Sequence, residues 1–304
     1  MPEGDTIFRT ATTLRPAMEG GRIEGARIRD RQFEVERIVG RTVAGVEARG
    51  KHLLMHLRLA APASGRGSAS IEANSVPVVS GPRPEDGATE ILHSHMGMTG
   101  SWHVYHPGQA WRKPAHYASL WLSINHLEVI CFSPKQLELL TADQFRRHPH
   151  IQRLGPDLLA ETFDEAAAVA RFRTRNALPI GEAVMNQTLV CGIGNIYKSE
   201  VLFLMHFDPF AVVGQFRDDE LARMLAKARQ LMRRNCGGPD RTTRLGSDAG
   251  RLWVYGKSGR PCPKCGMAIQ LRRQGEAGRT TCWCPECQPA RSLENGTSRP
   301  AIER

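Results

Sequence analysis

The stretch "VCGIGNIYKSE" (residues 190–200) places a glycine-rich turn directly before a helical segment. Asn195 occupies the position at which a helix N-cap is expected, and the backbone N–H groups at such a helix start can bind an anion. The alternative is a plain capping turn that binds nothing. The stretch is not a P-loop, because the Gly-Lys-Ser/Thr ending is absent, and it lacks the βαβ setting of a dinucleotide site.

Two cysteine pairs follow further along the chain, "CPKC" (262–265) and "CPEC" (284–287). Two C-x2-C pairs at this separation predict one Zn²⁺ held by four thiolates, a closed shell that is structural and not catalytic. Cys282 leaves an alternative open, since it could replace Cys284 as a ligand. We favour Cys284 because "CPEC" repeats the form of "CPKC". The predicted zinc ligands are therefore Cys262, Cys265, Cys284 and Cys287.

The chain is strongly basic, with a formal net charge of +10 and a pI of about 9.5. Such a balance predicts a polyanionic partner, of which nucleic acid is the commonest, although a solvated basic surface is the alternative. Residues 251–288 have seven Lys or Arg against two Glu. Ligation of zinc by four thiolates therefore leaves this segment basic. With few apolar residues of its own, the segment should need the metal to fold.

The 304 residues, 41% of them hydrophobic, suffice for two or three globular domains. The sequence has no run of about 18 apolar residues, which a membrane helix would need. It also has no basic segment followed by the apolar core of a signal peptide. We therefore expect a cytoplasmic protein whose cysteines are reduced.

The first 140 residues predict one helix and a mainly antiparallel β domain. Residues 5–18 place apolar side chains on one helical face, and Asp5 is expected to cap that helix. In "KHLLMHLRL" (51–59) apolar residues alternate along the chain, which predicts a strand with one buried face. A hairpin is expected within residues 118–132, with its turn at Asn125–His126.

Two further stretches have a distinct character. Residues 61–90 are rich in Ala, Pro, Gly and Ser and have no aromatic residue, which predicts a mobile surface insertion. After "LGPDLL" (154–159) the pattern becomes helical. Helices are expected within residues 163–175, 178–187, 192–205 and 217–238.

Several motifs occur in an order that resembles one protein family. They are "MPEG" at the N-terminus, "RGKHLL" (49–54), "HMGMTGSW" (95–102), "LGPDLL", "GIGNIYKSE" (192–200) and "VYGKSGRPCPKCG…CPECQ" (254–288). The ordered set resembles the formamidopyrimidine-DNA glycosylase / endonuclease VIII family over roughly residues 2–288. Only the 61–90 insertion and the last residues fall outside the resemblance.

The resemblance implies an α+β multidomain fold. It places a catalytic β-sandwich domain with an N-terminal helix at 2–140, a helix-two-turn-helix domain at 150–252 and a zinc finger at 253–288. A disordered tail is expected at 289–304. DNA would lie between the sandwich and the helical domain.

The resemblance also implies a bifunctional DNA glycosylase and abasic-site lyase of base excision repair, which removes oxidised bases and nicks the strand by β,δ-elimination. Pro2, exposed by removal of Met1, would be the Schiff-base nucleophile; an α-amine titrates near pH 8, at about 7.7–8.0. Glu3 matches the family's proton-shuttling carboxylate, and Lys51 matches a lysine that contacts phosphate and assists proton transfer. The implied partner is damaged double-stranded DNA, bound by a monomer at the nucleoid in the bacterial cytoplasm.

Three further residues match family positions that contact DNA. Asn195 matches the phosphate-binding Asn of the helix-two-turn-helix element, and Arg279 matches the phosphate-gripping Arg of the zinc finger. Met98 matches a side chain that fills the hole left by the flipped base, although a methionine there could instead be part of the core.

The sequence departs from the family pattern in two places. Positions 5 and 6 hold Asp5 and Thr6 in place of the acidic "PE" form. The segment "CFSPKQLELL" (131–140) has neither the Arg nor the second Phe of the loop found in enzymes that act on 8-oxoguanine. Both departures favour the endonuclease VIII-like branch and oxidised pyrimidines. They leave the residue that intercalates into the opposite strand unassigned.

Two other functions compete with the enzyme. A non-catalytic lesion-binding or DNA-binding zinc protein of the same fold would share the basic charge, the zinc module and the glycine-rich helix start. Such a protein has no need for Pro2, Glu3 and Lys51 together, which favours the enzyme. An RNA-binding zinc ribbon would need exposed aromatic residues for stacking, and an aromatic content of 6% without a cluster disfavours it.

Overall fold

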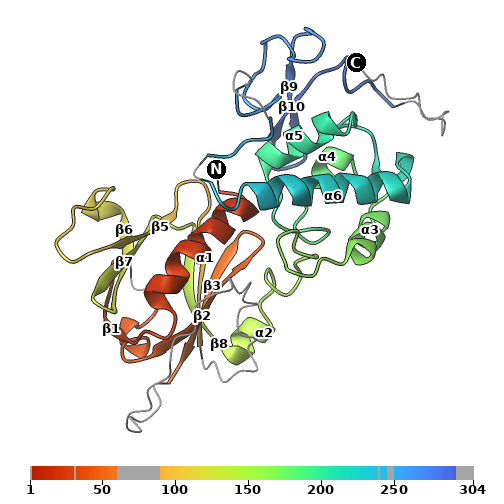
Figure 1. Cartoon of the computed structure of the whole chain (residues 1–304). Coiled ribbons are helices and arrows are strands. Elements are labelled where there is room, and N and C mark those ends of the chain that lie inside the picture. Colours follow the sequence, from red (N-terminus) through yellow and green to blue (C-terminus); the bar gives the residue numbers. More distant parts are fainter. Residues whose placement is uncertain (1, 31, 60–89, 239, 245–249, 292–304) are drawn as a thin grey trace, which may run out of the picture. The chain divides into compact units, whose positions relative to one another are not determined.

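The computed structural model divides into two compact units, Met1–Phe163 and Asp164–Arg304, and its mixture of helices and antiparallel sheets confirms the α+β multidomain class (Figure 1). None of the helices in the described part of the chain is long and apolar enough to cross a bilayer. The structure describes residues 2–30, 32–59, 90–238, 240–244 and 250–291.

The first unit consists of two four-stranded antiparallel sheets and the helix α1 (Gly4–Met18). One sheet has the strand order β1 (Ile23–Ile28), β6 (Ala118–Ile124), β7 (Leu127–Phe132) and β5 (Ser101–Tyr105). The other has the order β2 (Thr42–Arg49), β3 (His52–Arg58), β4 (Glu90–His95) and β8 (Gln136–Thr141). Short helical segments are found at Val35–Arg37 and Ala115–Tyr117 and in α2 (Ala142–Arg146).

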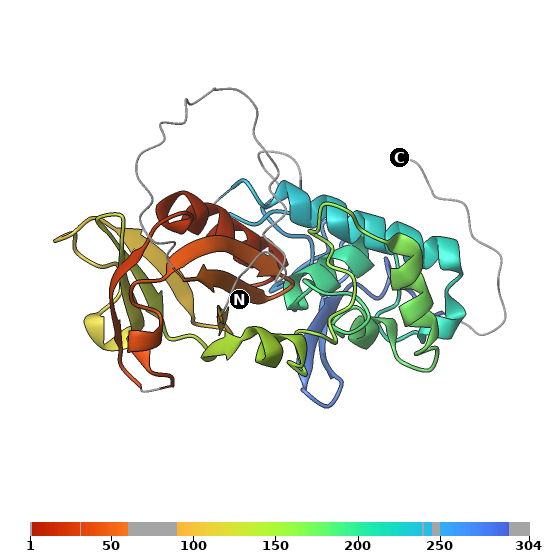
Figure 2. The same ribbon diagram turned by 90° about the horizontal axis from the view of Figure 1, so that it is seen from below.

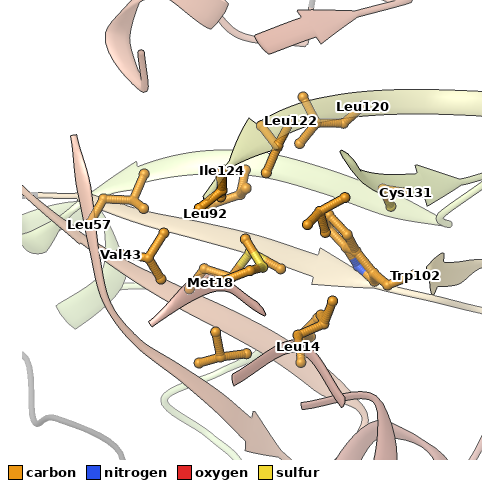
Figure 3. Close-up of a cluster of buried hydrophobic side chains, with 14 of the residues drawn as sticks. Leu14, Met18, Val43, Leu57, Leu92, Trp102, Leu120, Leu122, Ile124 and Cys131 are labelled. Atoms are coloured by element: carbon orange, nitrogen blue, oxygen red, sulfur yellow. The ribbon is translucent and has the colours of Figure 1, made fainter. Parts of the chain in front are cut away.

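The two sheets and α1 share one apolar core. The helix α1 (red) lies against the sheet that holds β2 and β3 (orange), as Figures 1 and 2 both show. Figure 3 shows Leu14 and Met18 of α1 meeting side chains of both sheets, such as Leu92 and Leu122. Because the core draws on all three layers, it fixes the start of α1 relative to the strands.

The expectation that β3 has one buried face is wrong, because side chains on both of its faces are buried. Leu53, Met55 and Leu57 face the main core, but Leu54 and His56 are buried as well. Leu54 packs with Phe145 of α2 in a second apolar cluster, so α2 and its flanking loops cover the opposite face. Alternation alone cannot show this, because the cover comes from a distant part of the chain.

The expected hairpin in residues 118–132 is confirmed. The strands β6 and β7 pair in antiparallel register up to Ile124 and Leu127. Between them Asn125 and His126 adopt left-handed φ angles of 51° and 60°. Positive φ at both central residues is the signature of the tight turn that matches the twist of paired strands.

The expected cap of α1 is wrong by two residues. Glu3, with extended φ and ψ of −124° and −177°, is the N-cap, and Asp5 lies inside the first turn. Short polar residues favour the cap position, so the sequence pointed to Asp5. The helix begins earlier than expected, and its first two residues, Gly4 and Asp5, are both buried.

The second unit contains the helices α3 (Glu165–Arg173), α4 (Ile180–Ala183), α5 (Asn195–Leu204) and α6 (Asp218–Arg234), with a short helical turn at Val213–Gln215. A two-stranded antiparallel hairpin, β9 (Gln270–Gln274) and β10 (Arg279–Trp283), follows. In Figure 2 these two strands (blue) run side by side. The apolar stripe of α6 is buried, as its sequence pattern predicts.

The helix α5 begins one residue earlier than expected. Gly194 is the N-cap, with an extended backbone and no capping side chain, and Asn195 is the first helical residue. The prediction that Asn195 caps α5 is therefore wrong. The consequence for function is that the Asn195 side chain is not engaged in capping its own helix and can contact another element.

Buried polar residues tie α5 to the segments that follow it. The Glu200 carboxylate is fully buried and accepts the backbone N–H groups of Trp253 at 2.7 Å, Val254 at 2.9 Å and Tyr255 at 2.8 Å. The Thr243 hydroxyl also donates to it. A buried carboxylate is stable only when its oxygens are satisfied in this way. This one residue thus orders the loop that leads into the cysteine-rich segment.

The expected insertion at 61–90 lies outside the described residues, except that Glu90 is the first residue of β4 and belongs to the sheet. Glu90 is buried and pairs with Arg37 and with Arg41, whose Nη2 is 3.0 Å from its Oε2. Including Glu90 in the insertion is therefore wrong. Of the expected tail at 289–304, only residues 289–291 are described.

We predict that Glu200→Ala destabilises the second unit by at least about 3 kcal/mol, because three buried N–H groups lose their acceptor. Amide hydrogen exchange at residues 253–255 should show lost protection, together with a lower melting temperature. The control is Glu276→Ala at an exposed position of the β9–β10 turn, which should change stability by less than about 0.5 kcal/mol. Equal protection in both variants would contradict the anchoring role.

Candidate functional site

Pro2 and Glu3 lie at the start of α1. Pro2 is half-buried and directly precedes Glu3, whose side chain is buried. The Glu3 carbonyl accepts the N–H of Thr6 at 2.9 Å and that of Ile7 at 3.1 Å, which fixes the backbone that carries Pro2. The arrangement places the Pro2 nitrogen and the Glu3 carboxylate in neighbouring residues at the fixed start of α1.

Thr6, the position at which the sequence departs from the family pattern, belongs to the same turn. Its hydroxyl oxygen is 3.5 Å from the backbone nitrogen of Glu3 and 3.4 Å from the Asp5 carboxylate. Contacts of this length are weak hydrogen bonds at best. Thr6 thus contacts both acidic neighbours without adding a third negative charge to the turn.

Lys51 lies at the tip of a two-residue turn between β2 and β3. Arg49 pairs with His52 across this turn, and Gly50 has a left-handed φ of 56°. The Gly50 N–H donates to the Asp157 carboxylate at 2.6 Å, and Asp157 also accepts the N–H of Leu159 at 2.8 Å. Burial raises the pKa of Asp157, while these two donors favour its ionised form.

Sequence reasoning assigned no role to Asp157, although it belongs to the motif "LGPDLL". Its contact with Gly50 spans more than a hundred positions of the chain, and no local pattern predicts such a pairing. The available signal was an acidic residue between a proline and an apolar pair, within one of the ordered motifs. The structure identifies it as the residue that anchors the turn carrying Lys51.

Met98 lies in a tight loop after β4 and is 71% exposed, which excludes the alternative that it is a core residue. The loop is closed by a hydrogen bond from the Gly100 N–H to the Met96 carbonyl at 2.9 Å. Gly97, at a left-handed φ of 63°, donates its N–H to Nδ1 of His95 at 3.2 Å. A Cβ on Gly97 would meet the Lys135 side chain at 2.7 Å, so the loop requires glycine there.

The structure brings the Lys51 turn, which precedes β3, and the Met98 loop, which follows β4, to the same end of these two neighbouring strands. His52, which follows Lys51, pairs directly with His95 across β3 and β4. Burial, followed by neighbouring histidines, lowers the pKa of His52 to about 2. Burial and the nearby charges of Lys135, His93 and Lys51 lower the pKa of His95 to about 4. Both imidazoles are therefore neutral at physiological pH.

Asn195 and the strand that carries Arg279 are neighbours in the second unit. The Asn195 Nδ2 atom lies 3.1 Å from the hydroxyl of Thr280, and the Lys198 ammonium donates to the Thr280 carbonyl at 3.0 Å. Arg279 is exposed next to this contact, at the start of β10. The α5 start and the β10 start can thus present an amide and a guanidinium to one anion.

The Asn195 amide is buried, and its Oδ1 atom has no hydrogen-bond partner among the described residues. The nitrogen and oxygen of an amide are assigned from their partners. Turning the amide by half a rotation lets Oδ1 accept the Thr280 hydroxyl and leaves Nδ2 as a donor. A buried polar atom without a partner is costly, and an anion that accepts from Nδ2 would remove that cost.

Four sulfurs come together at the predicted metal site. The Sγ atoms of Cys262, Cys265, Cys284 and Cys287 all lie within 4.8 Å of one another. The separation is 3.8 Å for Cys262–Cys287 and 3.4 Å for Cys265–Cys284. Tetrahedral Zn–S bonds of about 2.3 Å place sulfurs about 3.8 Å apart, so the four thiolates fit zinc.

Cys282 does not belong to this group. It is buried on β10, opposite Leu271 of β9, and its backbone N–H lies 3.4 Å from the Ser199 hydroxyl of α5. Burial raises the pKa of its thiol, which suits a neutral core side chain. It packs in an apolar cluster with Phe203 and Val254. The choice of Cys284 over Cys282 agrees with this geometry.

Comparison with protein families finds two matches. The family model for the formamidopyrimidine-DNA glycosylase N-terminal domain matches residues 1–147, and that for the formamidopyrimidine-DNA glycosylase H2TH domain matches residues 154–244. The two matches cover the first unit and the helical part of the second.

Curated relatives match the chain along nearly its whole length. It is 35% identical to the probable endonuclease 8 2 of Streptomyces coelicolor over 95% of this chain and 94% of the relative. It is 33% identical to the DNA-(apurinic or apyrimidinic site) lyase Nei2 of Mycolicibacterium smegmatis over 95% of this chain and 100% of the relative.

Solved structures share the fold. The Lactococcus lactis formamidopyrimidine-DNA glycosylase, non-covalently bound to DNA with an abasic site, superimposes with a TM-score of 0.72 at 23% identity, covering 95% of this chain and 100% of its own. The MutM (Fpg) protein of Thermus thermophilus gives a TM-score of 0.71 at 26% identity, with coverages of 94% and 98%.

The low pKa of His52 predicts acid sensitivity of the first unit. The folded pKa lies below the ordinary value of 6.5, so its contribution to stability is complete above pH 6.5 and is lost as the pH falls toward about 2. Between pH 6.5 and 5 the loss is about 2 kcal/mol, at about 1.4 kcal/mol per pH unit. Denaturant unfolding of His52→Gln should therefore show a shallower loss over this interval than the parent protein. Equal slopes would contradict a neutral His52.

Proposed function

The chain belongs to the formamidopyrimidine-DNA glycosylase / endonuclease VIII family, and we propose on that premise that it is a DNA glycosylase and abasic-site lyase of base excision repair that acts through the amine of Pro2. The proposal rests on two observations taken together, a similarity to a relative and a local arrangement of residues. A relative named as an abasic-site lyase matches over its whole length. The chain also holds Pro2 and a buried Glu3 together at the fixed start of α1.

The proposed chemistry begins at the Pro2 nitrogen, which is a secondary amine once Met1 is removed. It attacks C1′ of the damaged nucleotide, the N-glycosidic bond breaks and the base leaves with the bonding electron pair and a proton. Opening of the sugar then gives an iminium ion between Pro2 and C1′. That cation acidifies the C2′ proton, so the 3′ phosphate leaves by β-elimination and the 5′ phosphate by δ-elimination.

Each proposed partner of Pro2 has a chemical task. Glu3, which directly follows Pro2, moves protons during base release and sugar opening. Lys51 binds a phosphate and assists proton transfer from the tip of the turn that Gly50 and Asp157 hold. Met98, exposed on its tight loop, fills the space from which the nucleotide is flipped.

Damaged double-stranded DNA is the proposed partner, bound by a monomer in the bacterial cytoplasm. Asn195 and Arg279 are proposed to bind backbone phosphates, which carry no base information. Oxidised pyrimidines are the proposed lesions, since relatives carry endonuclease 8 names and the segment 131–140 has no Arg. The proposed domains are the catalytic part at 2–140, the helical part at 150–252 and the zinc finger at 253–288.

One structural Zn²⁺ is proposed on Cys262, Cys265, Cys284 and Cys287. When bound, the ion supplies a rigid cross-link and no open coordination position. The cross-link joins both ends of a segment that contains β9 and β10 and therefore holds Arg279. Phe203 of α5 packs against this segment, so the metal and α5 together orient the proposed phosphate contact.

Borohydride trapping on duplex DNA tests the proposed function. With an abasic site or thymine glycol in the duplex, the mature protein should form a reduced covalent adduct. An N-terminal extension should abolish it because the amine is displaced, and Pro2→Gly should strongly reduce it. The control is Pro107→Gly at an exposed turn of the same unit, which should trap normally. If a protein with a verified N-terminal Pro2 forms no adduct, the chain is instead a non-catalytic DNA-binding protein.

The zinc proposal separates the two candidate ligand sets. Metal analysis should find one Zn²⁺ per chain in the parent protein and in Cys282→Ser, and a reduced content in Cys284→Ser. Loss of one thiolate should weaken duplex binding, because the zinc finger needs the metal to fold and loss of even an outer-shell partner of a ligand costs about 10–100-fold in metal affinity or activity. The opposite ranking of the two variants would assign Cys282 as the ligand.

A further inference from the structure

A cluster of histidines lies on the face of the β2-β3-β4-β8 sheet that points away from the main core. The register places His52 opposite His95, and it places His93 opposite Glu138. His148, which follows α2, reaches the same face. His52, His93 and His148 are buried, and none of these three side chains has a task in the proposed chemistry.

The Glu138 carboxylate is the centre of this cluster. A single oxygen, Oε1, lies 2.6 Å from Nδ1 of His93, 3.0 Å from Nε2 of His148 and 2.9 Å from Nε2 of Gln136. All three separations are hydrogen-bond distances. A carboxylate oxygen that accepts three N–H donors is saturated. The group therefore forms a continuous hydrogen-bonded network.

The partners assign a proton position to each imidazole. Nδ1 of His148 accepts the backbone N–H of Ile151 at 3.2 Å, so its proton is on Nε2, toward Glu138. His93 donates from Nδ1 to Glu138, so its Nε2 is an acceptor. Nδ1 of His52 lies 2.8 Å from that acceptor and must carry the proton.

The hydrogen-bonded series from Glu138 through His93 ends at His52, which lies beside the proposed functional residues. His52 directly follows Lys51, and its ring also contacts the ring of His95, with centroids 5.0 Å apart at 63°. His95 in turn accepts the Gly97 N–H, so its own proton is on Nε2. Glu138 is thus connected, through His93 and His52, to the turn of Lys51 and to the loop of Met98.

The assigned tautomers require the imidazoles of His93 and His52 to be neutral. If His93 were an imidazolium, its Nε2 would donate, and His52 would have to reverse its tautomer. Burial lowers the pKa of His93 although Glu138 raises it, and His148 and His150 lower it further. The groups that face His52 are the imidazoles of His93, His95, His148 and His150, all of which disfavour a positive charge. Lys51 and Lys135 act in the same sense on His95.

We propose that Glu138, His93 and His52 are positioning residues: the Glu138 carboxylate fixes the tautomer of His93, His93 fixes that of His52, and the three together hold the Lys51 turn and the Met98 loop in place. The role rests on the proposed function, because it concerns how that site is kept in its active geometry. It does not require any of the three side chains to touch DNA. An active-site group displaced by about 1 Å can lose about 100-fold in rate, so support of this kind affects catalysis directly.

The first experiment measures tautomers in the full chain and does not depend on activity. Long-range ¹H–¹⁵N spectra of protein labelled with ¹⁵N-histidine, assigned with single His→Gln variants, should show neutral His52 and His93 protonated on Nδ1 at pH 7. His95 and His148 should be protonated on Nε2. A charged His93 or a reversed tautomer at His52 would overturn the proposal. So would displacement of the His93 and His148 signals by Zn²⁺ added beyond the first equivalent, which would indicate a metal site.

The second experiment compares three variants in single-turnover borohydride trapping at saturating enzyme. Glu138→Leu removes the acceptor and should lower the trapping rate at least about tenfold, with little change in the Kd for duplex DNA. Glu138→Gln keeps an acceptor oxygen and should restore most of the rate. His106→Gln, an exposed histidine of the same unit, is the matched control.

The outcomes distinguish this proposal from the proposed function. Equal rates for Glu138→Leu and the parent protein would refute the positioning role and leave the lyase intact. Equal losses in Glu138→Leu and Glu138→Gln would show that the negative charge is required, which also overturns a role based on an acceptor. No adduct with the parent protein would refute the proposed function itself. If Glu138→Leu fails to fold, the tautomer measurement on the parent protein still decides.

Discussion

The burial of polar residues on α5 is the constraint on which the second unit depends. Helices usually turn apolar side chains inward, but α5 also buries Asn195, Lys198 and Glu200. Desolvating an ionised group costs several kcal/mol unless it finds partners, and each of these residues finds them on a later segment of the chain. Lys198 and Asn195 contact β10, and Glu200 binds the loop at residues 253–255. These hydrogen bonds specify where the cysteine-rich segment docks on α5.

The first unit has the same kind of anchoring, in which half-buried polar groups hold the backbone beside the proposed functional side chains. The turn of Lys51 depends on the carboxylate of Asp157, and the loop of Met98 depends on the imidazole of His95. In each case a half-buried group binds a backbone N–H next to the functional residue, and the side chain of that residue is half-buried for Lys51 and exposed for Met98. Backbone anchoring of this kind leaves the side chain able to meet a ligand while its Cα position is fixed. The apolar core alone, which is non-directional, would not set these positions.

Much of the fold was predictable because its signals are local. The turn at Asn125–His126, the apolar stripe of α6 and the spacing of the four zinc ligands each lie within a short stretch of sequence, and local patterns predict them. Three expectations failed. Both N-caps were misplaced, since Glu3 and Gly194 are the caps and not Asp5 and Asn195. The two-sided burial of β3 depends on what a distant segment contributes. The anchors Asp157 and Glu200 were missed for the same reason, since their partners are far away in the sequence.

The placement of anchors also explains why a motif can be longer than its functional residue. In "GIGNIYKSE" only Asn195 is proposed to contact DNA, whereas Lys198 and Glu200, one turn further along α5, fix the elements around it. In "RGKHLL" the proposed contact is Lys51, and its neighbours Gly50 and His52 carry the hydrogen bonds that hold it. A substitution at an anchoring residue shifts the functional residue without removing any contact to the ligand. We therefore expect it to lower the rate of the chemical step more than the affinity. The motifs of this chain are therefore units of one functional group with its support, and the support is the part that packing arguments alone would misread as core.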